Sequence, residues 1–266
     1  MDFMKKYEYW LNSDSIDEKD KEELRGLKDN PKEIEDRFFK DLSFGTGGIR
    51  GVRGIGTNRI NKYVIRKATQ GLANYMLTFN EKEAKEQGII IAHDCRIGSR
   101  EYALNTARVM AANGIKAYIY EDLRSTPELS FGVRYKGTMA GIVVTASHNP
   151  VEYNGYKVYW NDGAQVVDPH ATLIVDEVNK ISTLEEIKVI SEENGREKGL
   201  IIQLDNKIDD DYIKEIKKQT IISEIQGKES FKIVYTPLHG TGGRPMERIL
   251  TDFGYSYEVV KEQIKP

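Results

Sequence analysis

Ser147 and His148 stand next to each other in the segment Thr-Ala-Ser-His-Asn-Pro at residues 145–150. The apolar residues 141–144 precede this segment and predict a buried strand, so the serine lies where a strand ends and a loop begins. Loops at the carboxyl ends of parallel strands are where α/β proteins place their binding sites. A serine hydroxyl can accept a transferred group, and the imidazole beside it can act as a base or a hydrogen-bond donor. The same residue types are common in ordinary turns, so the pair alone leaves both interpretations open.

A serine hydrolase is the first chemistry to consider for this pair. The nucleophile elbow Gly-x-Ser-x-Gly is absent, because Ala146 and His148 flank Ser147. A serine and a histidine adjacent in sequence rarely form a triad, because the base must reach the hydroxyl and needs its own orienting partner. The sequence therefore disfavours hydrolysis, and labelling of Ser147 by a fluorophosphonate tests that conclusion.

Two glycine-rich segments favour phosphate binding instead. Arg50, Arg53 and Arg244 lie in or beside the segments 45–56 and 240–243. Backbone N–H groups in such turns and at helix N-termini bind phosphate. Neither segment is a P-loop, and the dinucleotide pattern Gly-x-Gly-x-x-Gly fails at Arg50. Plain tight turns are the alternative explanation.

The hydrophobic pattern predicts alternating strands and helices that would hold these segments. Strands are expected at 88–92, 116–120, 139–145 and 156–160, and helices at 61–79, 99–112, 126–137 and 169–180. Such alternation indicates βαβ units and a largely parallel sheet. The first forty residues are expected to be helical, with Ser15 and Glu18 forming a capping box and a helix starting at Asn30-Pro31.

The chain length and a second set of elements predict two domains. The chain has 266 residues, and a domain takes roughly 150. The polar residues 191–198 are expected to form a surface turn or a domain boundary. A helix at 209–219, a strand at 231–236, a helix ending near 253 and a strand at 255–260 follow. We assign residues 1–205 to a first domain and 206–266 to the incomplete start of a second; the alternative is that these last elements complete the edge of one continuous sheet.

Composition excludes several classes of protein. The 39 lysines and arginines against 42 aspartates and glutamates give a net charge of −3, which argues against a nucleic-acid-binding protein. Cys95 is the single cysteine, so an intramolecular disulfide and a cysteine-based zinc site are both excluded. Apolar stretches are far shorter than the roughly 20 residues of a membrane span. With no signal peptide in view, we expect a cytoplasmic protein without a membrane partner.

Four motifs together resemble the α-D-phosphohexomutase superfamily, which includes phosphoglucomutases, phosphomannomutases and related phosphopentomutases. Residues 145–150 resemble its phosphoserine loop, and Phe-Gly-Thr-Gly-Gly-Ile-Arg-Gly at 44–51 resembles its N-terminal loop. Asn-Gly-Tyr-Lys at 154–157 resembles the motif after the serine loop, and Thr-Pro-Leu-His-Gly-Thr-Gly at 236–242 the opening of the second domain. Residues 56–75 look most like the bacterial phosphoglucomutase branch that also embraces phosphopentomutases. The resemblance implies an α/β fold: a mixed, largely parallel sheet flanked by helices, then the start of a second, similar α/β domain.

The resemblance implies a phosphoryl-transfer role for four residues. Ser147 matches the serine that carries the phosphate, donates it to a sugar monophosphate and recovers the other phosphate of the resulting bisphosphate. Lys157 matches the lysine proposed as general acid and base, and Arg50 the arginine near the transferring phosphate. His148 matches a histidine of the same loop that hydrogen-bonds substrate or phosphate. Phosphoryl transfer depends mainly on positioning and charge neutralisation, which suits such a set.

The resemblance also implies substrate-binding or phosphate-binding roles for further residues. Asn149 is expected to shape the loop and contact phosphate together with Arg50. Arg96, which follows His93 and Asp94 at a strand end, is expected to face the same cleft. His239 is a weaker candidate, since a histidine that packs its own loop fits the position equally well.

The chain departs from the family pattern at the metal site. Family members bind Mg²⁺ through the phosphoserine and three aspartates of an Asp-x-Asp-x-Asp-Arg loop, and use a glucose 1,6-bisphosphate-type activator. That pattern is absent here, and the acidic residues 209–211 are predicted to begin a helix, where acids favour the dipole. Ser147, through its phosphate, is then the one metal ligand that the resemblance implies for this chain. We expect an N-terminal fragment of a mutase that interconverts hexose 1-phosphate and 6-phosphate, inactive alone.

A non-catalytic module that binds sugar phosphates or accepts a phosphoryl group is the alternative to a mutase fragment. Sugar phosphates are the expected partners in either case. The choice among glucose, mannose and pentose phosphates, the oligomeric state and the phosphorylation of Ser147 stay open at this stage.

Overall fold

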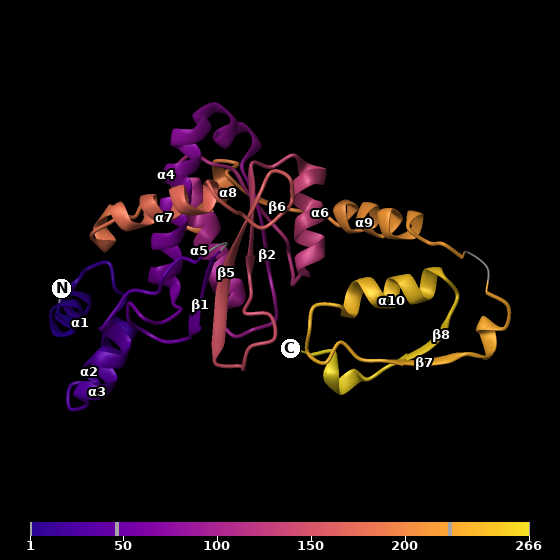
Figure 1. The fold of residues 1–266 in the computed structure, drawn as a ribbon, viewed down its shortest axis with the longest axis horizontal. Coiled ribbons are helices and arrows are strands. Elements are labelled where there is room, and N and C mark those ends of the chain that lie inside the picture. Colours follow the sequence, from indigo (N-terminus) through magenta and orange to yellow (C-terminus); the bar gives the residue numbers. More distant parts are fainter. Residues whose placement is uncertain (1, 46–47, 223–224, 266) are drawn as a thin grey trace.

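The computed structural model describes residues 2–45, 48–222 and 225–265 (Figure 1). The helices are α1 (Phe3–Asn12), α2 (Glu18–Arg25), α3 (Pro31–Phe38), α4 (Lys62–Gln87), α5 (Ser99–Ala112), α6 (Thr126–Lys136), α7 (His170–Lys180), α8 (Glu192–Glu197), α9 (Lys207–Lys218) and α10 (Gly243–Asp252). The strands are β1 (Gly48–Val52), β2 (Ile89–His93), β3 (Ala117–Ile119), β4 (Ala140–Val144), β5 (Tyr153–Trp160), β6 (Ile201–Gln203), β7 (Lys232–Tyr235) and β8 (Ser256–Val259). Each described helix is too short or too polar to span a membrane.

Six strands form the main sheet in the order β1-β5-β4-β2-β3-β6. The pairs β2–β3, β2–β4 and β3–β6 are parallel, whereas β5 runs antiparallel to both β4 and β1. The sheet is therefore mixed and mostly parallel, as expected. Because β5 returns directly beside β4, the loop that joins them stays at the carboxyl end of β4.

Helices cover both faces of this sheet, and the central strands alternate between the two cores (Figure 1). Ile89 and Ile91 of β2 face the larger core, which α4, α5 and α7 cover. Ile90 faces the opposite core, where Leu129 and Val133 of α6 lie. All five residues of β2 and of β4 are buried, as is typical of strands enclosed on two faces. A rigid, doubly covered strand thus leads into the Ser147 loop.

The N-terminal helices α1, α2 and α3 form a separate apolar cluster against the start of α4. Trp10 packs edge-on against Phe38 and Tyr63. The helix start at Asn30-Pro31 is confirmed, because Asn30 caps the N–H of Glu33. The capping box at Ser15 is wrong: α2 begins at Glu18 with Asp17 as its N-cap, and the Ser15 hydroxyl bonds Glu185 instead.

The second region is small and joined to the first by α9 (Figure 1). Its strands β7 and β8 form a separate parallel pair, so the alternative of one continuous sheet is wrong. Asp209 in the first turn of α9 is buried and accepts two hydrogen bonds of 2.9 Å from Arg124 of the first region. Arg244 of α10 also lies 3.2 Å from Asp209, so one carboxylate links the two regions.

Strand β1 lies in the glycine-rich segment, for which no strand was predicted, and two other short elements also differ from the prediction. Residues 192–197, expected as a turn, form the helix α8, which packs on α5. The three-residue strand β6 extends the sheet beside β3 and has no counterpart among the predicted strands. Both elements are too short for hydrophobic periodicity to reveal them.

Candidate active site

Ser147 lies on the exposed loop between β4 and β5, in a backbone conformation that non-glycine residues rarely adopt. Its φ is +56°, in the left-handed region. Its side-chain Oγ lies 3.3 Å from Nδ1 of His148, which is also exposed. The structure thus presents the serine hydroxyl to solvent at the carboxyl end of a central strand.

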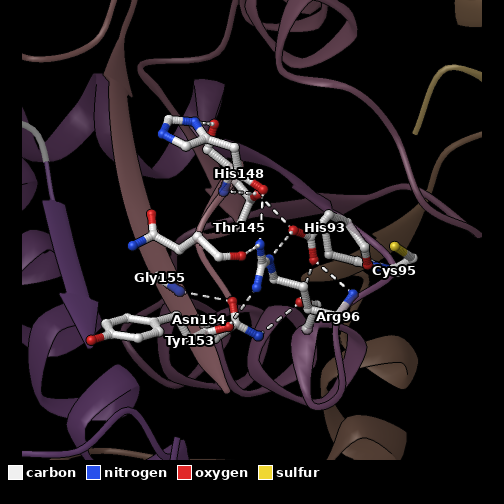
Figure 2. Close-up of polar contacts among 12 residues, drawn as sticks. His93, Cys95, Arg96, Thr145, His148, Tyr153, Asn154 and Gly155 are labelled. Carbon is white, nitrogen blue, oxygen red and sulfur yellow. Dashed lines mark hydrogen bonds and ion pairs between the residues drawn. The ribbon is translucent and has the colours of Figure 1, made fainter. Parts of the chain in front are cut away.

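A buried polar cluster holds the base of this loop (Figure 2). The Thr145 hydroxyl donates to Oδ2 of Asp94 at 2.6 Å and accepts the backbone N–H of Ser147 at 2.9 Å. The other carboxylate oxygen of Asp94 accepts from the Ser99 hydroxyl at 2.6 Å. Arg96 lies among these groups, with its guanidinium against the backbone of the loop. We name Asp94, Arg96, Ser99 and Thr145 the Asp94 cluster.

The start of β5 is hydrogen-bonded to the same loop and to the Asp94 cluster. The N–H of Thr145 donates to the carbonyl of Gly155 at 3.0 Å, and the buried Asn154 amide donates to the Ser99 hydroxyl at 2.9 Å. A Cβ at position 155 would lie 2.6 Å from the Thr145 carbonyl oxygen and 2.8 Å from that of Ile49. Only glycine therefore allows the three backbones to approach this closely.

Strands β1 and β5 bring two cations to this edge of the sheet. Arg50 is directly opposite Gly155 in the antiparallel register, and Lys157 is two residues further along β5, on the same face. Arg50 donates from Nη1 to the side-chain oxygen of Asn149 at 2.9 Å. The structure therefore brings Arg50, Asn149 and the serine loop together from segments far apart in the sequence.

The environment of Lys157 makes its ammonium easier to deprotonate. Partial burial lowers the pKa of Lys157 below its usual value, the positive charge of Arg50 lowers it further, and Asp94 acts in the opposite direction. A lysine with a lowered pKa can accept and return a proton nearer neutral pH than a free lysine.

His239 lies on the turn between β7 and α10, and its ring contacts the backbone of residue 265. Its Nδ1 lies 2.8 Å from the carbonyl oxygen of Lys265, and its N–H donates to the carbonyl of Gln263 at 2.9 Å. Its carbonyl accepts from the thiol of Cys95, which connects this turn with the residue between Asp94 and Arg96. A role for His239 in binding phosphate stays a prediction.

The structure describes only part of the first glycine-rich segment, whereas it describes the second in full. Thr46 and Gly47 of the N-terminal loop lie outside the described residues. Arg244, beside the second segment, pairs with Asp209 and donates to Asn206 at 2.8 Å, so its guanidinium contributes to the junction with α9.

An α/β/α domain that gathers a serine hydroxyl, an arginine and a lysine at one end of its sheet is the class that this fold and site define. The family model described as phosphoglucomutase/phosphomannomutase, alpha/beta/alpha domain I, matches residues 41–185, and the model for domain II matches residues 210–266. The chain belongs to the phosphoglucomutase/phosphomannomutase family.

Individual relatives agree with this assignment. The phosphoglucomutase of Staphylococcus haemolyticus (strain JCSC1435) is 39% identical over 208 residues, which are 78% of this chain and 36% of that protein. The structure of a phosphomannomutase-like protein from Thermus thermophilus superimposes with a TM-score of 0.68 at 20% identity, covering 84% of this chain and 46% of the other. A phosphoglucomutase/phosphomannomutase family protein from Burkholderia thailandensis gives 0.62 at 21% identity, with 84% and 44% covered. The chain thus spans less than half the length of these relatives.

The donor set among the described residues does not fit a complete magnesium site. The family typically uses Mg²⁺. Within residues 2–45, 48–222 and 225–265, however, no group of three or more His, Cys, Asp or Glu side chains is placed to hold a metal ion. The Asp94 carboxylate is occupied by the hydroxyls of Ser99 and Thr145. We therefore derive no step through the metal.

Sequence reasoning missed most of the Asp94 cluster and the carboxylate that joins the two regions. Thr145 was noted only as part of a motif, and Ser99 only as a helix start. The signal that points to them is the placement of Asp94 and Thr145 at the ends of two neighbouring parallel strands, whose carboxyl ends meet at one edge. Asp209 was expected to favour a helix dipole, and its partner Arg124 lies 85 positions away in the chain.

Proposed function

We propose that this chain forms the phosphoserine-bearing part of a sugar-phosphate mutase that interconverts hexose 1-phosphate and hexose 6-phosphate. The observation that carries the proposal is the exposed Ser147 hydroxyl, held on a braced loop beside Arg50 and Lys157. The membership of the family supports the same reaction class.

In the proposed reaction Ser147 first carries a phosphoryl group. The bond between phosphorus and Ser147 Oγ breaks as a new bond forms to a free hydroxyl of the sugar monophosphate, and the hydroxyl proton passes to neutral Lys157. The departing Ser147 oxygen takes this proton from Lys157, so the step leaves a sugar bisphosphate, an unmodified serine hydroxyl and neutral Lys157. In the second transfer the Ser147 hydroxyl attacks the other phosphoryl group, its proton passes to Lys157, and Lys157 gives that proton to the sugar oxygen that the phosphorus leaves.

The neighbouring side chains have separate tasks in this scheme. Arg50 offsets the negative charge of the transferring phosphoryl group, since phosphoryl transfer is promoted mainly by positioning and by charge stabilisation. Its positive charge also lowers the pKa of Lys157, which prepares that side chain to accept a proton. His148 lies next to Ser147 Oγ and can donate a hydrogen bond to a phosphate there.

Mass spectrometry of a chimera tests the proposal. In the chimera this chain replaces the matching part of the S. haemolyticus phosphoglucomutase, 39% identical over that part. The chimera is incubated with glucose 1,6-bisphosphate and Mg²⁺. Its intact mass is expected to rise by one phosphoryl group in the unsubstituted chimera and in its Ser182→Ala variant, which removes an exposed serine as a control. No such rise is expected in the Ser147→Ala chimera. Assays with glucose, mannose and pentose 1-phosphates then define the substrate.

The same experiment separates the mutase from a non-catalytic module. Binding of sugar phosphates with no phosphorylation of Ser147 in the folded chimera would support the module and reject the mutase. We further propose that the 266-residue chain alone gives no turnover, because its described residues include no cluster of three or more His, Cys, Asp or Glu side chains that could hold a metal ion. Measurable mutase activity of the unfused chain contradicts this part of the proposal.

A further inference from the structure

Both Nη atoms of the Arg96 side chain donate all their hydrogen bonds to the protein. An arginine side chain carries five such donors in a rigid fork. The four on the two Nη atoms face backbone carbonyls at 2.6–3.0 Å, those of Ser147, Asn149, Pro150 and Tyr153. The fifth, on Nε, faces the Asp94 carboxylate at 3.3 Å. A phosphate could bind this guanidinium only by displacing loop contacts that are already made.

The two peptide groups of Ser147 are held from opposite sides by the same cluster. Its N–H donates to the Thr145 hydroxyl, and its carbonyl accepts from Arg96 at 2.9 Å (Figure 2). The Thr145 hydroxyl donates its hydrogen to Asp94, which leaves a lone pair of that hydroxyl for the Ser147 N–H. Asp94 also pairs with Arg96, which closes the network.

The left-handed backbone of Ser147 requires such support. A residue with a side chain adopts this conformation only where the surroundings over-determine it. The cluster supplies that constraint from β2, β4 and the start of α5, all of which are fixed in the sheet and its cores. The direction of the Ser147 side chain, and thus of any phosphate on it, follows from these contacts.

Arg50 differs from Arg96 in how few of its N–H donors have a partner in the protein. In the described part of the chain its guanidinium makes one side-chain hydrogen bond, to Asn149, and the residue is exposed. It therefore retains donors that can face a phosphate.

We propose that Arg96, with Asp94 and Thr145, positions Ser147 for phosphoryl transfer, and that Arg96 is not a phosphate ligand. This role rests on the proposed function and replaces the expectation that Arg96 contacts the phosphate. Of the two arginines, Arg50 is then the one that binds phosphate.

Hydrogen exchange at the Ser147 N–H of the ligand-free 266-residue chain is the first test, because it reports loop order without catalysis. Arg96→Lys keeps the charge but loses the fork, and Thr145→Val removes the accepting hydroxyl but keeps the side-chain shape. Both are expected to speed exchange at Ser147 about tenfold, the loss of one ordinary hydrogen bond. Thr145→Ser and Arg100→Lys, a matched change at an exposed position of α5, are expected to leave it unchanged.

The outcome of this test is decisive in either direction. Unchanged exchange in a folded Arg96→Lys chain overturns the proposal. If that variant does not fold, Thr145→Val decides in the same way, with circular dichroism as the check on folding.

The chimera supplies a second, kinetic test. A positioning role predicts that Arg96→Lys lowers kcat about 100-fold, as a misplacement of about 1 Å can do, while KM for the sugar phosphate stays unchanged. Arg50→Lys is expected to raise KM as well. A rise in KM for Arg96→Lys with unchanged Ser147 exchange would identify a phosphate ligand and overturn the proposal. If Ser147 is never phosphorylated but the exchange results hold, the positioning role stands and the mutase proposal falls.

Discussion

Among the described residues, two loops place non-glycine residues in the left-handed region, and they differ in what holds them there. Ser147 has φ +56°, and Leu238 and His239 have φ +46° and +59°. The first loop follows β4, buried along its whole length, whereas the second follows β7, whose residues alternate between exposed and half-buried. Backbone conformation by itself therefore does not distinguish the two loops.

The supports of the two loops explain the difference. Ser147 is tied to side chains from two neighbouring strands through Thr145, Asp94 and Arg96. His239 is tied mainly to the backbone of residues 263 and 265, close to its own end of the chain. A loop held by buried side chains of a finished sheet can keep a reactive group in one orientation, which is what catalysis requires. The following predictions test how far the two regions differ in rigidity.

The largest effect is expected where the two regions meet, at Asp209. Asp209→Asn removes the charge from a buried carboxylate that pairs with Arg124 and Arg244, and leaves the buried Arg124 with the longer ion pair to Glu128, at 3.8 Å. Breaking a buried pair in this way costs about 3–5 kcal/mol. Urea unfolding followed by circular dichroism measures the loss. Asp211→Asn, which breaks the exposed pair with Lys214, is the control and should cost less than about 1 kcal/mol; equal effects would contradict the linking role of Asp209.

A second prediction compares the close packing of the two regions. Gly155→Ala forces a Cβ to within 2.6 Å of the Thr145 carbonyl oxygen, so the free energy of unfolding should fall by about 3 kcal/mol. Gly243→Ala, at the start of α10, meets Ile264 at an ordinary 3.5 Å and should change stability by less than about 1 kcal/mol, in the stabilising direction. Both values come from thermal or urea unfolding. A comparable loss in both variants would show that the second region is packed as tightly as the first.

The third prediction concerns the pH dependence that Lys157 introduces. Because the pKa of Lys157 is lowered in the folded chain, the unfolded chain binds more protons between that lowered value and the ordinary value of 10.5. The contribution of Lys157 to the free energy of unfolding should therefore rise with pH between these two pKa values. Arg50→Gln removes a charge that lowers the pKa of Lys157, so NMR titration of its side chain should give a higher pKa. An unchanged or lower value would show that the two cations do not interact.

The sequence predicted the scaffold of the first region better than the contacts within its site. Helix α5 was predicted at its observed bounds, because apolar periodicity and the Asn113-Gly114 stop agree there. The reversal of β5 was not predicted, since hydrophobic pattern does not encode strand direction. The partners of Arg96 could not be predicted either, because four of them are backbone carbonyls whose positions exist only once the loop has folded. Thr145 and Asp94 lie 51 residues apart and meet only through the pairing of β2 with β4.

The smallest predicted effect comes from glycine substitutions at one left-handed position of each loop, Ser147 and His239. Ser147→Gly removes the cost of holding a side chain at φ +56° and should raise the free energy of unfolding by about 0.5–1 kcal/mol, measured by urea unfolding. His239→Gly gains the same relief but loses the imidazole contact with the Lys265 carbonyl, so its gain should be smaller. Ser147→Ala, which removes the hydroxyl but keeps the Cβ, is the matched control and should show no gain. If Ser147→Ala raised the free energy of unfolding as much as Ser147→Gly, the exposed hydroxyl would be the destabilising group. The predicted difference between the two variants instead assigns the destabilisation to the left-handed backbone that the Asp94 cluster constrains.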